Sequence, residues 1–314
     1  MSDNKPALVA LDWGTSALRA FLVGPDGAVL EQRSRPWGIL SLPDGGYPAA
    51  FASITDGWPI GMLPAIACGM VGSRAGWKQV PYLALPCDPA SLAGALDQVA
   101  IPGAGVLHLV PGLLDPAGPD VMRGEETEAF GALEALADAD GEIVLVMPGT
   151  HSKWVRSANR VLTGFSTYMT GELFAVLTRH SILAAVDHRE PAETEAGDDA
   201  FRDGVRAAAA DGLARRLFST RALTLTGRLP ETLAPDYLSG LLIGEELGSA
   251  LPLHPSGRVV LIGAPALTRR YALAFATLGR LVPAILQEAA VRGLYRIALS
   301  AGLLAPSPGD TPPC

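Results

Sequence analysis

Two short Gly-Thr segments carry the residue types of a phosphate site. The first, Asp12-Trp-Gly-Thr-Ser16, follows an apolar run and is closed by Arg19. Gly14 allows the backbone to approach a ligand closely, and Thr15 and Ser16 supply hydroxyl and N–H donors. Asp12, at the end of the apolar run, has the chemistry to hold a hydrated cation. Taken alone, these residues fit an ordinary β-hairpin with a polar turn equally well.

The second segment repeats this design about one domain's length further along the chain. Glu142–Val155 contains an apolar strand, a Gly149-Thr150 turn, the basic residue Lys153 and the start of another strand. A Gly-Thr pair recurs easily by chance, but its recurrence with flanking strands and a following cation does not. The repeat predicts two phosphate-binding hairpins, one in each of two domains, that face each other across a cleft.

Three further segments carry candidate contact residues, and each has a plain structural alternative. The 71–80 loop, with Ser73, Arg74 and Trp77, suits contact with a small molecule or a surface loop with solvated cations. Glu125 and Glu126 begin a predicted helix, where acidic residues are common because they face the positive end of the helix dipole. A small-residue turn at 263–264 joins a strand to a helix and would let a base or ribose lie against the backbone.

Alternating apolar and polar patterns give the elements that position these segments. A hairpin of strands is predicted at 7–11 and 20–23, with a third strand at 29–33, and 37–61 is predicted to be rich in loops. Further strands are expected within 104–114, 142–147 and 258–267. A short apolar run occupies 62–70, and a turn at 157–159 leads into 161–165. Helices are expected at 120–136, from 170, at 200–220, 233–250 and 285–304, and an acidic loop at 190–199. We expect domains at 1–137 and 138–314, with the last helix packing back at the hinge between them.

Composition limits the class of protein. The 314 residues, 49% hydrophobic and 18% charged, describe a globular chain of about two domains. No apolar run has the length of a membrane span, no signal peptide is visible, and three cysteines are too few for a disulfide framework, so we expect a cytoplasmic protein. The net charge of −8 argues against partnership with nucleic acid or anionic membranes. The P-loop, dinucleotide-binding and G-x-S-x-G motifs are all absent from the sequence.

Six segments together resemble those of a known enzyme family. They are Asp12–Ser16 with Arg19, Gly72–Arg74 with Gly76-Trp77, Met122–Thr127, Pro148–Trp154, Met169–Val176 and Leu261–Leu267. Over nearly its whole length the chain resembles the 2-dehydro-3-deoxygalactonokinases of the actin/hexokinase/Hsp70-like ATPase superfamily. The resemblance implies an α/β fold of two RNase H-like domains around a nucleotide cleft. It also implies ATP- and Mg²⁺-dependent phosphorylation of the C6 hydroxyl of a small sugar acid, 2-dehydro-3-deoxy-D-galactonate, in galactose or galactonate catabolism.

The resemblance also suggests how the binding roles are divided. Gly14, Thr15, Ser16 and Arg19 would hold the β- and γ-phosphates, Asp12 would contact Mg²⁺, Gly149, Thr150 and Lys153 would hold phosphate from the other domain, and Gly263 and Ala264 would border the adenosine. For the substrate carboxylate, a planar bidentate donor is preferred, and Arg74 is the first candidate. Ser73 and Trp77 would shape its pocket, and Arg123 is the second candidate.

Three carboxylates are candidates for the group that accepts the proton of the attacking hydroxyl. By position relative to the second hairpin, Glu126 matches the aspartate that serves as base in sugar kinases of the superfamily. A glutamate is one methylene longer, which leaves Glu125 and Asp120 as further candidates.

Two alternative functions are compatible with the sequence. One is a kinase for another sugar or sugar acid, and the other is a nucleotide-gated regulatory protein that hydrolyses ATP slowly. The sequence is compatible with a homo-oligomer and does not indicate whether the galacto or gluco epimer is preferred.

Overall fold

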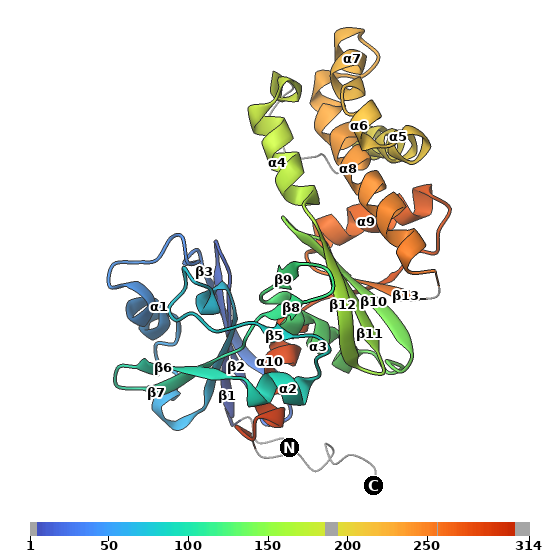
Figure 1. Cartoon of the computed structure of the whole chain (residues 1–314). Coiled ribbons are helices and arrows are strands. Elements are labelled where there is room, and N and C mark those ends of the chain that lie inside the picture. Colours follow the sequence, from blue (N-terminus) through green and yellow to red (C-terminus); the bar gives the residue numbers. More distant parts are fainter. Residues whose placement is uncertain (1–4, 186–193, 256, 305–314) are drawn as a thin grey trace. The chain divides into compact units, whose positions relative to one another are not determined.

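The computed structural model describes residues 5–185, 194–255 and 257–304, which fold into two compact units (Figure 1). Unit 1 comprises Met1–Gly141, Ser157–Phe165 and Glu288–Cys314, and unit 2 comprises Glu142–Arg156 and Ser166–Gln287. The chain first crosses from unit 1 to unit 2 after Gly141, four residues beyond the predicted domain boundary at 137/138. Helix α10 (Ala289–Ser300) belongs to unit 1, because it packs against α3 (Glu125–Ala135) and β1 (Leu8–Trp13).

The main sheet of unit 1 is built around β1. Its order is β3-β2-β1-β4-β7-β6, with β2 at Leu18–Val23, β3 at Val29–Arg35, β4 at Ala65–Gly69, β6 at Asp97–Ile101 and β7 at Gly105–Leu109. β1 pairs antiparallel with β2 and parallel with β4, and β4 pairs parallel with β7. The predicted hairpin and the predicted third strand are therefore confirmed.

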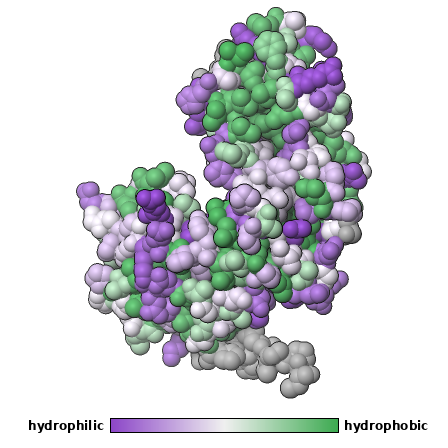
Figure 2. Space-filling model, in the orientation of Figure 1, coloured by the Kyte–Doolittle hydropathy of each residue, from purple (hydrophilic) through white to green (hydrophobic). Residues whose placement is uncertain are grey.

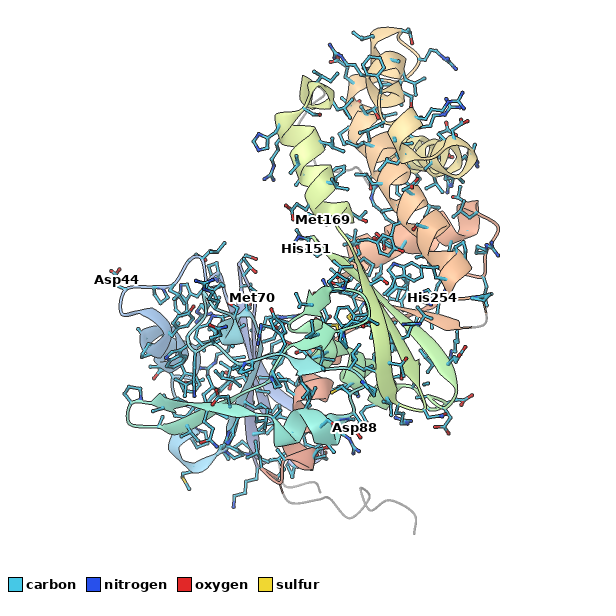
Figure 3. The ribbon with its side chains drawn as sticks, in the orientation of Figure 1. Asp44, Met70, Asp88, His151, Met169 and His254 are labelled. Carbon is cyan, nitrogen blue, oxygen red and sulfur yellow. The ribbon has the colours of Figure 1, made fainter. Side chains whose placement is uncertain are left out.

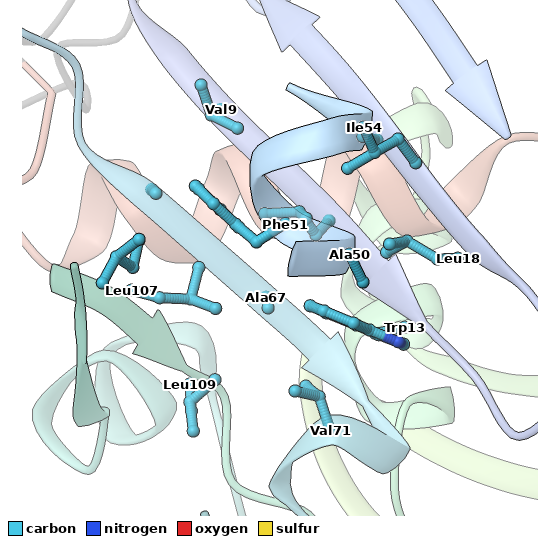
Figure 4. Packing of buried hydrophobic residues seen from close by; sticks show 14 of the residues in the cluster. Val9, Trp13, Leu18, Ala50, Phe51, Ile54, Ala67, Val71, Leu107 and Leu109 are labelled. Carbon is cyan, nitrogen blue, oxygen red and sulfur yellow. The ribbon is translucent and has the colours of Figure 1, made fainter. Parts of the chain in front are cut away.

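The core of unit 1 explains why β1 is apolar on both faces. Figure 4 shows Phe51 and Ile54 of α1 (Gly46–Ile54) packed with Val9 and Ala67 of the sheet. α3 and α10 form a second helical layer of the unit, and they approach so closely that a Cβ on Gly131 would lie 1.8 Å from the Ala289 carbonyl oxygen. The prediction that 37–61 is rich in loops missed α1, a short helix that has Gly45 as its N-cap and begins at Gly46.

Two other predictions for unit 1 need correction. The single strand predicted at 104–114 is two strands, β7 and β8 (Leu113–Asp115), which lie in different sheets because the 110–112 segment contains Pro111, a residue without an N–H donor. The helix predicted from residue 120 begins only at Glu125. Before it, β9 (Asp120–Met122) joins β5 (Leu83–Ala84) and β8 in a small sheet, and α2 (Pro89–Gly94) lies earlier in the chain.

Unit 2 repeats the strand arrangement of unit 1. Its sheet has the order β12-β11-β10-β13-β14, with β10 at Glu142–Met147, β11 at Ser152–Ala158, β12 at Val161–Tyr168, β13 at Arg258–Ile262 and β14 at Ala284–Leu286. β10 pairs parallel with β13, and β13 with β14. In both units the next two strands lie on one side of the first strand and two parallel strands lie on the other, where unit 1 adds β6 as an antiparallel edge strand. The predicted fold class, two RNase H-like α/β domains, is confirmed.

The helices of unit 2 pack around a buried helix, α8. They are α4 (Thr170–His180), α5 (Glu195–Asp211), α6 (Leu213–Arg216), α7 (Ser219–Leu225), α8 (Ala234–Ala250) and α9 (Pro265–Thr277). α5 and α8 meet through glycines, since a Cβ on Gly204 would lie 2.1 Å from the Tyr237 carbonyl oxygen. Figure 2 shows apolar surface over this helical part of unit 2.

Two predictions at helix starts in this part of the chain were inaccurate. Part of the predicted acidic loop at 190–199 lies outside the described residues, and the rest is helical, because the Thr194 side chain accepts a hydrogen bond from Gly197 N and caps α5. The last helix begins at Ala289 instead of 285, since Ala284–Leu286 forms β14. Among the described residues, none of the helices has both the length and the apolar character needed to span a membrane.

Candidate functional site

The turn between β1 and β2 is held by its own backbone. Gly14 N donates to the Ala17 carbonyl over 2.9 Å, and the N–H groups of Ile39 and Leu40 donate to the carbonyls of Gly14 and Thr15 at 3.1 and 3.2 Å. Thr15 and Ser16, at the tip, are exposed. The carbonyls are thus occupied by neighbouring backbone while the hydroxyl side chains stay accessible, which suits a turn that binds an anion.

Gly38 makes this support possible, and the sequence alone did not indicate it. A Cβ at this position would lie 2.1 Å from Thr15 O and 2.3 Å from Ser16 N. Real Cβ atoms do not approach backbone atoms so closely, so any side chain here would displace the turn. The segment around Gly38 is therefore a structural part of the first candidate phosphate site.

Charged groups surround the end of β1. The Asp12 carboxylate forms an ion pair with Arg19, whose Nη2 lies 4.0 Å from Glu128 Oε1. Burial, together with the nearby charges of Asp12 and Glu125, raises the pKa of Glu128 to about 7. Glu128 was not among the predicted site residues, although it lies in the first turn of the helix that carries Glu125 and Glu126.

The residues of this region fit a cation held mainly by phosphate and water. The described residues contain no group of three or more His, Cys, Asp or Glu side chains placed to hold a metal ion. Asp12 is the one predicted metal ligand, and a single carboxylate is a usual protein contribution to Mg²⁺ in phosphate-bound sites. Asp12 therefore fits Mg²⁺ that arrives with a nucleotide.

The start of α3 lies against the end of β4, next to Asp12. A Cβ on Gly124, whose φ is 110°, would lie 3.3 Å from Gly69 Cα, and a Cβ on Gly69 would lie 3.5 Å from Asp12 Oδ1. Met70, labelled in Figure 3, marks the end of β4. These contacts bring the predicted acidic residues of α3 to the same edge of the unit 1 sheet as the first turn.

The three candidate bases occupy different environments. Glu126 is 0% exposed and accepts hydrogen bonds from Gly124 N at 2.7 Å and Thr127 Oγ1 at 3.0 Å. Burial, reinforced by Glu125, raises the pKa of Glu126 to about 8. Glu125 is half-buried and accepts a hydrogen bond from Arg123 N at 3.0 Å, and Asp120 lies in β9 instead of the helix.

Arg123 and Ser73 are buried polar side chains with unused hydrogen-bonding atoms. Arg123, 9% exposed, donates from Nη2 to Val80 O at 2.7 Å and lies 4.5 Å over the Tyr82 ring. Its Nε and Nη1 atoms, and Ser73 Oγ, have no hydrogen-bond partner among the described residues. A Cβ on Gly72, next to Ser73, would lie 3.0 Å from Arg123 Nη1. The unused nitrogens of Arg123 therefore lie beside the backbone that leads to Ser73, and an anion would suit them.

The other predicted contacts of the 71–80 loop lie differently. Arg74 is exposed. Trp77 stacks on Tyr47 at 5.6 Å between ring centroids, and Trp13, at the end of β1, meets both rings edge-on. Lys78 pairs with Asp97 at 2.7 Å. The loop thus packs through its aromatic ring against the end of β1, while Arg74 is exposed, in contrast to the buried Arg123.

The turn between β10 and β11 is supported by the start of α4. Glu172 N donates to Thr150 O at 2.9 Å, and the His151 ring pairs with the Glu172 carboxylate. A Cβ on Gly171 would lie 2.5 Å from Gly149 O. Figure 3 shows His151 beside Met169, the residue that precedes α4. Lys153, 4% exposed, donates to the His151 carbonyl at 3.2 Å.

A pocket of about 400 Å³ adjoins this second turn within unit 2. Its lining combines backbone and polar groups with apolar side chains and comes from the turn, α4, α8 and α9: Gly149, Thr150, Thr170, Gly171, Phe174, Ser239, Leu242, Ile243, Ala266, Leu267, Arg270 and Tyr271. This volume lies within the usual range for a small-molecule site. The predicted residues Gly263 and Ala264 directly precede the lining part of α9, and Gly263 adopts φ 141°. Thr170 and Gly171 lie in a recognised motif but were not predicted as contacts.

The two sheets, each with a Gly-Thr turn after its first strand, give the chain the two RNase H-like α/β domains of the predicted fold class. The sequence pattern of the 2-keto-3-deoxy-galactonokinase family matches residues 12–297. The chain belongs to this family.

Two curated relatives and one solved structure agree with this assignment. A Rhizobium meliloti (strain 1021) protein, assigned as a 2-dehydro-3-deoxygalactonokinase, is 41% identical over 90% of this chain and 93% of its own length. The 2-dehydro-3-deoxygalactonokinase of Escherichia coli (strain K12) is 37% identical over 92% of this chain and 97% of its own. The crystal structure of a Sinorhizobium meliloti protein assigned to the same activity superposes with a TM-score of 0.83 at 37% identity, covering 93% of this chain and 98% of that chain.

Proposed function

We propose that this protein transfers the γ-phosphoryl group of ATP to the C6 hydroxyl of 2-dehydro-3-deoxy-D-galactonate, giving the 6-phosphate and ADP in galactonate catabolism. Membership of the family, over residues 12–297, is the observation that carries the proposal. The family consists of ATP-dependent sugar-acid kinases, and the chain has a pocket of suitable size beside one of its two Gly-Thr turns.

The pocket of unit 2 is the proposed adenosine site. It opens beside Gly149 and Thr150, whose turn would bind phosphate, and the buried cation of Lys153 would add positive charge. The apolar side chains of Phe174 and Leu242 offer a surface for the base. Gly263 and Ala264 would support the same site from the strand end that precedes α9.

The turn of unit 1 is the proposed site of the reacting phosphates. Thr15 and Ser16 would donate to phosphate oxygens, and Arg19 would neutralise charge, as phosphoryl transfer requires mainly positioning and charge stabilisation. Asp12 would hold Mg²⁺, which neutralises the phosphate charge when bound. Asp12 has to exchange part of its contact with Arg19 for this role.

Glu125 is the proposed acceptor of the C6 hydroxyl proton. A base must reach the hydroxyl within hydrogen-bond distance. Glu126 is fully enclosed, is held by two internal hydrogen bonds and has a pKa of about 8, so it is mostly protonated at neutral pH. Glu125 follows Gly124 at the start of α3 and is half-buried, so it is partly accessible. Glu126 would then hold the shape of the Gly124 turn that presents Glu125.

Arg123 and Ser73 are the proposed partners of the substrate carboxylate. An arginine buried without an anionic partner is costly, and a bidentate carboxylate would satisfy its two unused nitrogens. Arg74, the first candidate from the sequence, is exposed and would act at most at the rim of this site. Trp77, on the Tyr47 stack, would provide an apolar wall.

Release of ADP, measured with 2-dehydro-3-deoxy-D-galactonate and its gluconate-derived epimer side by side, tests the proposal. We expect release to depend on the acid and to be faster with the galacto epimer. Faster release with another sugar acid from a wider panel would assign a different acceptor. Tight ATP binding with no stimulation by any acid would instead support a nucleotide-gated regulatory protein.

A further inference from the structure

A buried polar network in unit 2 lies below the second turn, and two of its members, Thr170 and Tyr271, also line the pocket. At its centre is Glu246 of α8, which is 2% exposed. Its Oε1 accepts a hydrogen bond from Trp154 Nε1 at 2.8 Å, and its Oε2 accepts from Tyr271 Oη at 2.6 Å and from Thr170 Oγ1. Trp154 lies on β11, Thr170 begins α4 and Tyr271 lies on α9, so one carboxylate joins four elements around the pocket.

The network reaches the backbone of the turn. Tyr271 Oη lies 2.9 Å from Ser152 Oγ, and Gly149 N donates to Ser152 Oγ at 3.4 Å. Because the single tyrosine proton is donated to Glu246, the Ser152 hydroxyl has to donate to Tyr271. Every bond of the relay therefore points the same way, from the Gly149 N–H through Ser152 and Tyr271 to the Glu246 carboxylate.

The direction of this relay depends on an acceptor-only group at its end. Burial raises the pKa of Glu246, while the donated hydrogen bonds from Thr170, Tyr271 and Trp154 oppose that rise. A glutamine would place its NH₂ donor either against Trp154 Nε1 or against the Tyr271 and Thr170 hydroxyls, so at least one hydrogen bond of the network would be lost or reversed. The carboxylate is thus matched to its surroundings in hydrogen-bonding character as well as in size.

We propose that Glu246 is a positioning residue for nucleotide binding, which acts through Tyr271 and Ser152 on the Gly149 turn and through Thr170 on the start of α4. This inference rests on the proposed function, in which the turn binds phosphate of ATP. The two routes converge, because Gly171, next to Thr170, packs directly on Gly149 and Thr150. The carboxylate thereby fixes both the turn and the helix start that supports it.

A matched pair of serines tests the relay. Ser152 is 0% exposed and lies outside the lining of the pocket, so its substitution cannot remove a direct contact with nucleotide. Ser219, half-buried in unit 2, makes a serine–tyrosine hydrogen bond of similar length, with its Oγ 2.8 Å from Tyr237 Oη, and also donates to the Arg216 carbonyl. We expect Ser152→Ala to raise the Kd for MgADP, measured by titration calorimetry, about tenfold, the equivalent of losing one hydrogen bond. Ser219→Ala is expected to stay within about twofold of the wild type.

The outcomes separate the relay from the proposed function. Wild-type protein that fails to bind MgADP would overturn the proposed function and this inference with it. Wild-type binding with an unchanged Kd in Ser152→Ala would overturn the inference alone. An equal loss of MgADP affinity in Ser152→Ala and Ser219→Ala would also overturn the inference, since it would reflect a general destabilisation of unit 2.

Glu246→Gln provides a kinetic test of the same inference. We expect the KM for ATP to rise by about tenfold or more while the KM for the sugar acid stays unchanged, because the network lies within the nucleotide-binding unit. Equal increases in both KM values would contradict a positioning role in nucleotide binding. If Glu246→Gln does not fold, as judged by thermal unfolding, the serine pair decides the question.

Discussion

The two Gly-Thr turns have the same place in the two sheets, but different groups support them. In unit 1 the turn lies above a charged cluster of Asp12, Arg19 and Glu128, and a loop with Gly38 backs it. In unit 2 the turn lies above a relay of uncharged donors that ends on Glu246, and the start of α4 backs it. A pocket of about 400 Å³ adjoins the turn of unit 2.

This difference indicates a division of labour. Charges that can exchange partners suit a site where phosphate, cation and proton rearrange during reaction. A fixed network of hydrogen bonds beside a largely apolar pocket suits a site that binds one ligand in one orientation. We therefore propose that unit 1 carries the chemistry and that unit 2 provides most of the nucleotide binding.

The largest expected effect comes from Glu125→Gln. Removal of the proposed base should lower kcat by about 10²–10⁴-fold, the usual contribution of general base catalysis. Glu126→Gln is the matched control, one residue away and buried, and should lower kcat by less than about tenfold. Steady-state ADP release measures both. Near-normal turnover in Glu125→Gln with a large loss in Glu126→Gln would reassign the base to Glu126.

The second-largest effect is expected from Arg123→Ala. Loss of a charged donor pair should raise the KM for the sugar acid by about 10–100-fold and leave the KM for ATP nearly unchanged. Arg74→Ala, in the same region but exposed, should change the KM for the acid by less than about threefold. A larger effect from Arg74→Ala than from Arg123→Ala would identify Arg74 as the arginine that binds the substrate carboxylate.

Gly171→Ala sharpens the comparison between the turns. A methyl group there meets the Gly149 carbonyl, so the turn must shift, at a cost of about 1–3 kcal/mol to the native arrangement. We expect weaker MgADP binding by about tenfold. Gly248→Ala, whose new methyl group would meet nothing within 4 Å in the same unit, is the control and should bind normally. Unchanged binding in Gly171→Ala would remove the turn of unit 2 from the nucleotide site.

The smallest expected effect is a pH-dependent change in stability at Glu126. In the folded protein its carboxyl remains protonated up to a pKa of about 8, whereas in the unfolded chain it ionises near 4.5. Between these values the folded state binds the extra proton, so the stability that Glu126 contributes falls as pH rises. Glu126→Gln should therefore gain stability relative to wild type, by several degrees more in Tm at pH 8 than at pH 5. An equal difference at both pH values would contradict burial as the cause of the raised pKa.

The sequence predicted the frame of the fold well, because strand hairpins and their turns are local features. The apolar runs before Asp12 and Gly149, each followed by a polar turn, were sufficient to place the central hairpins. The strand β9 and the short helix α1 were missed, since three-residue strands and glycine-flanked helices depend on tertiary contacts more than on their own pattern.

The candidate sites were only partly predictable for the same reason. Residue types identified Arg123, Glu125 and the two turns, but burial separated Arg123 from Arg74 and Glu125 from Glu126. Gly38 and Gly171 support the turns from distant or adjoining segments, and their role depends on backbone proximity that no spacing reveals. Glu246 is one of three acidic residues in α8, with Asp236 and Glu245, and its residue type gave no signal of its buried partners.

The division of labour is tested most directly by measuring MgADP affinity and turnover together in Glu125→Gln and Gly171→Ala. Our account predicts that Glu125→Gln binds MgADP like the wild type yet loses turnover, and that Gly171→Ala loses affinity for MgADP. A loss of MgADP affinity in Glu125→Gln as large as that in Gly171→Ala would contradict it.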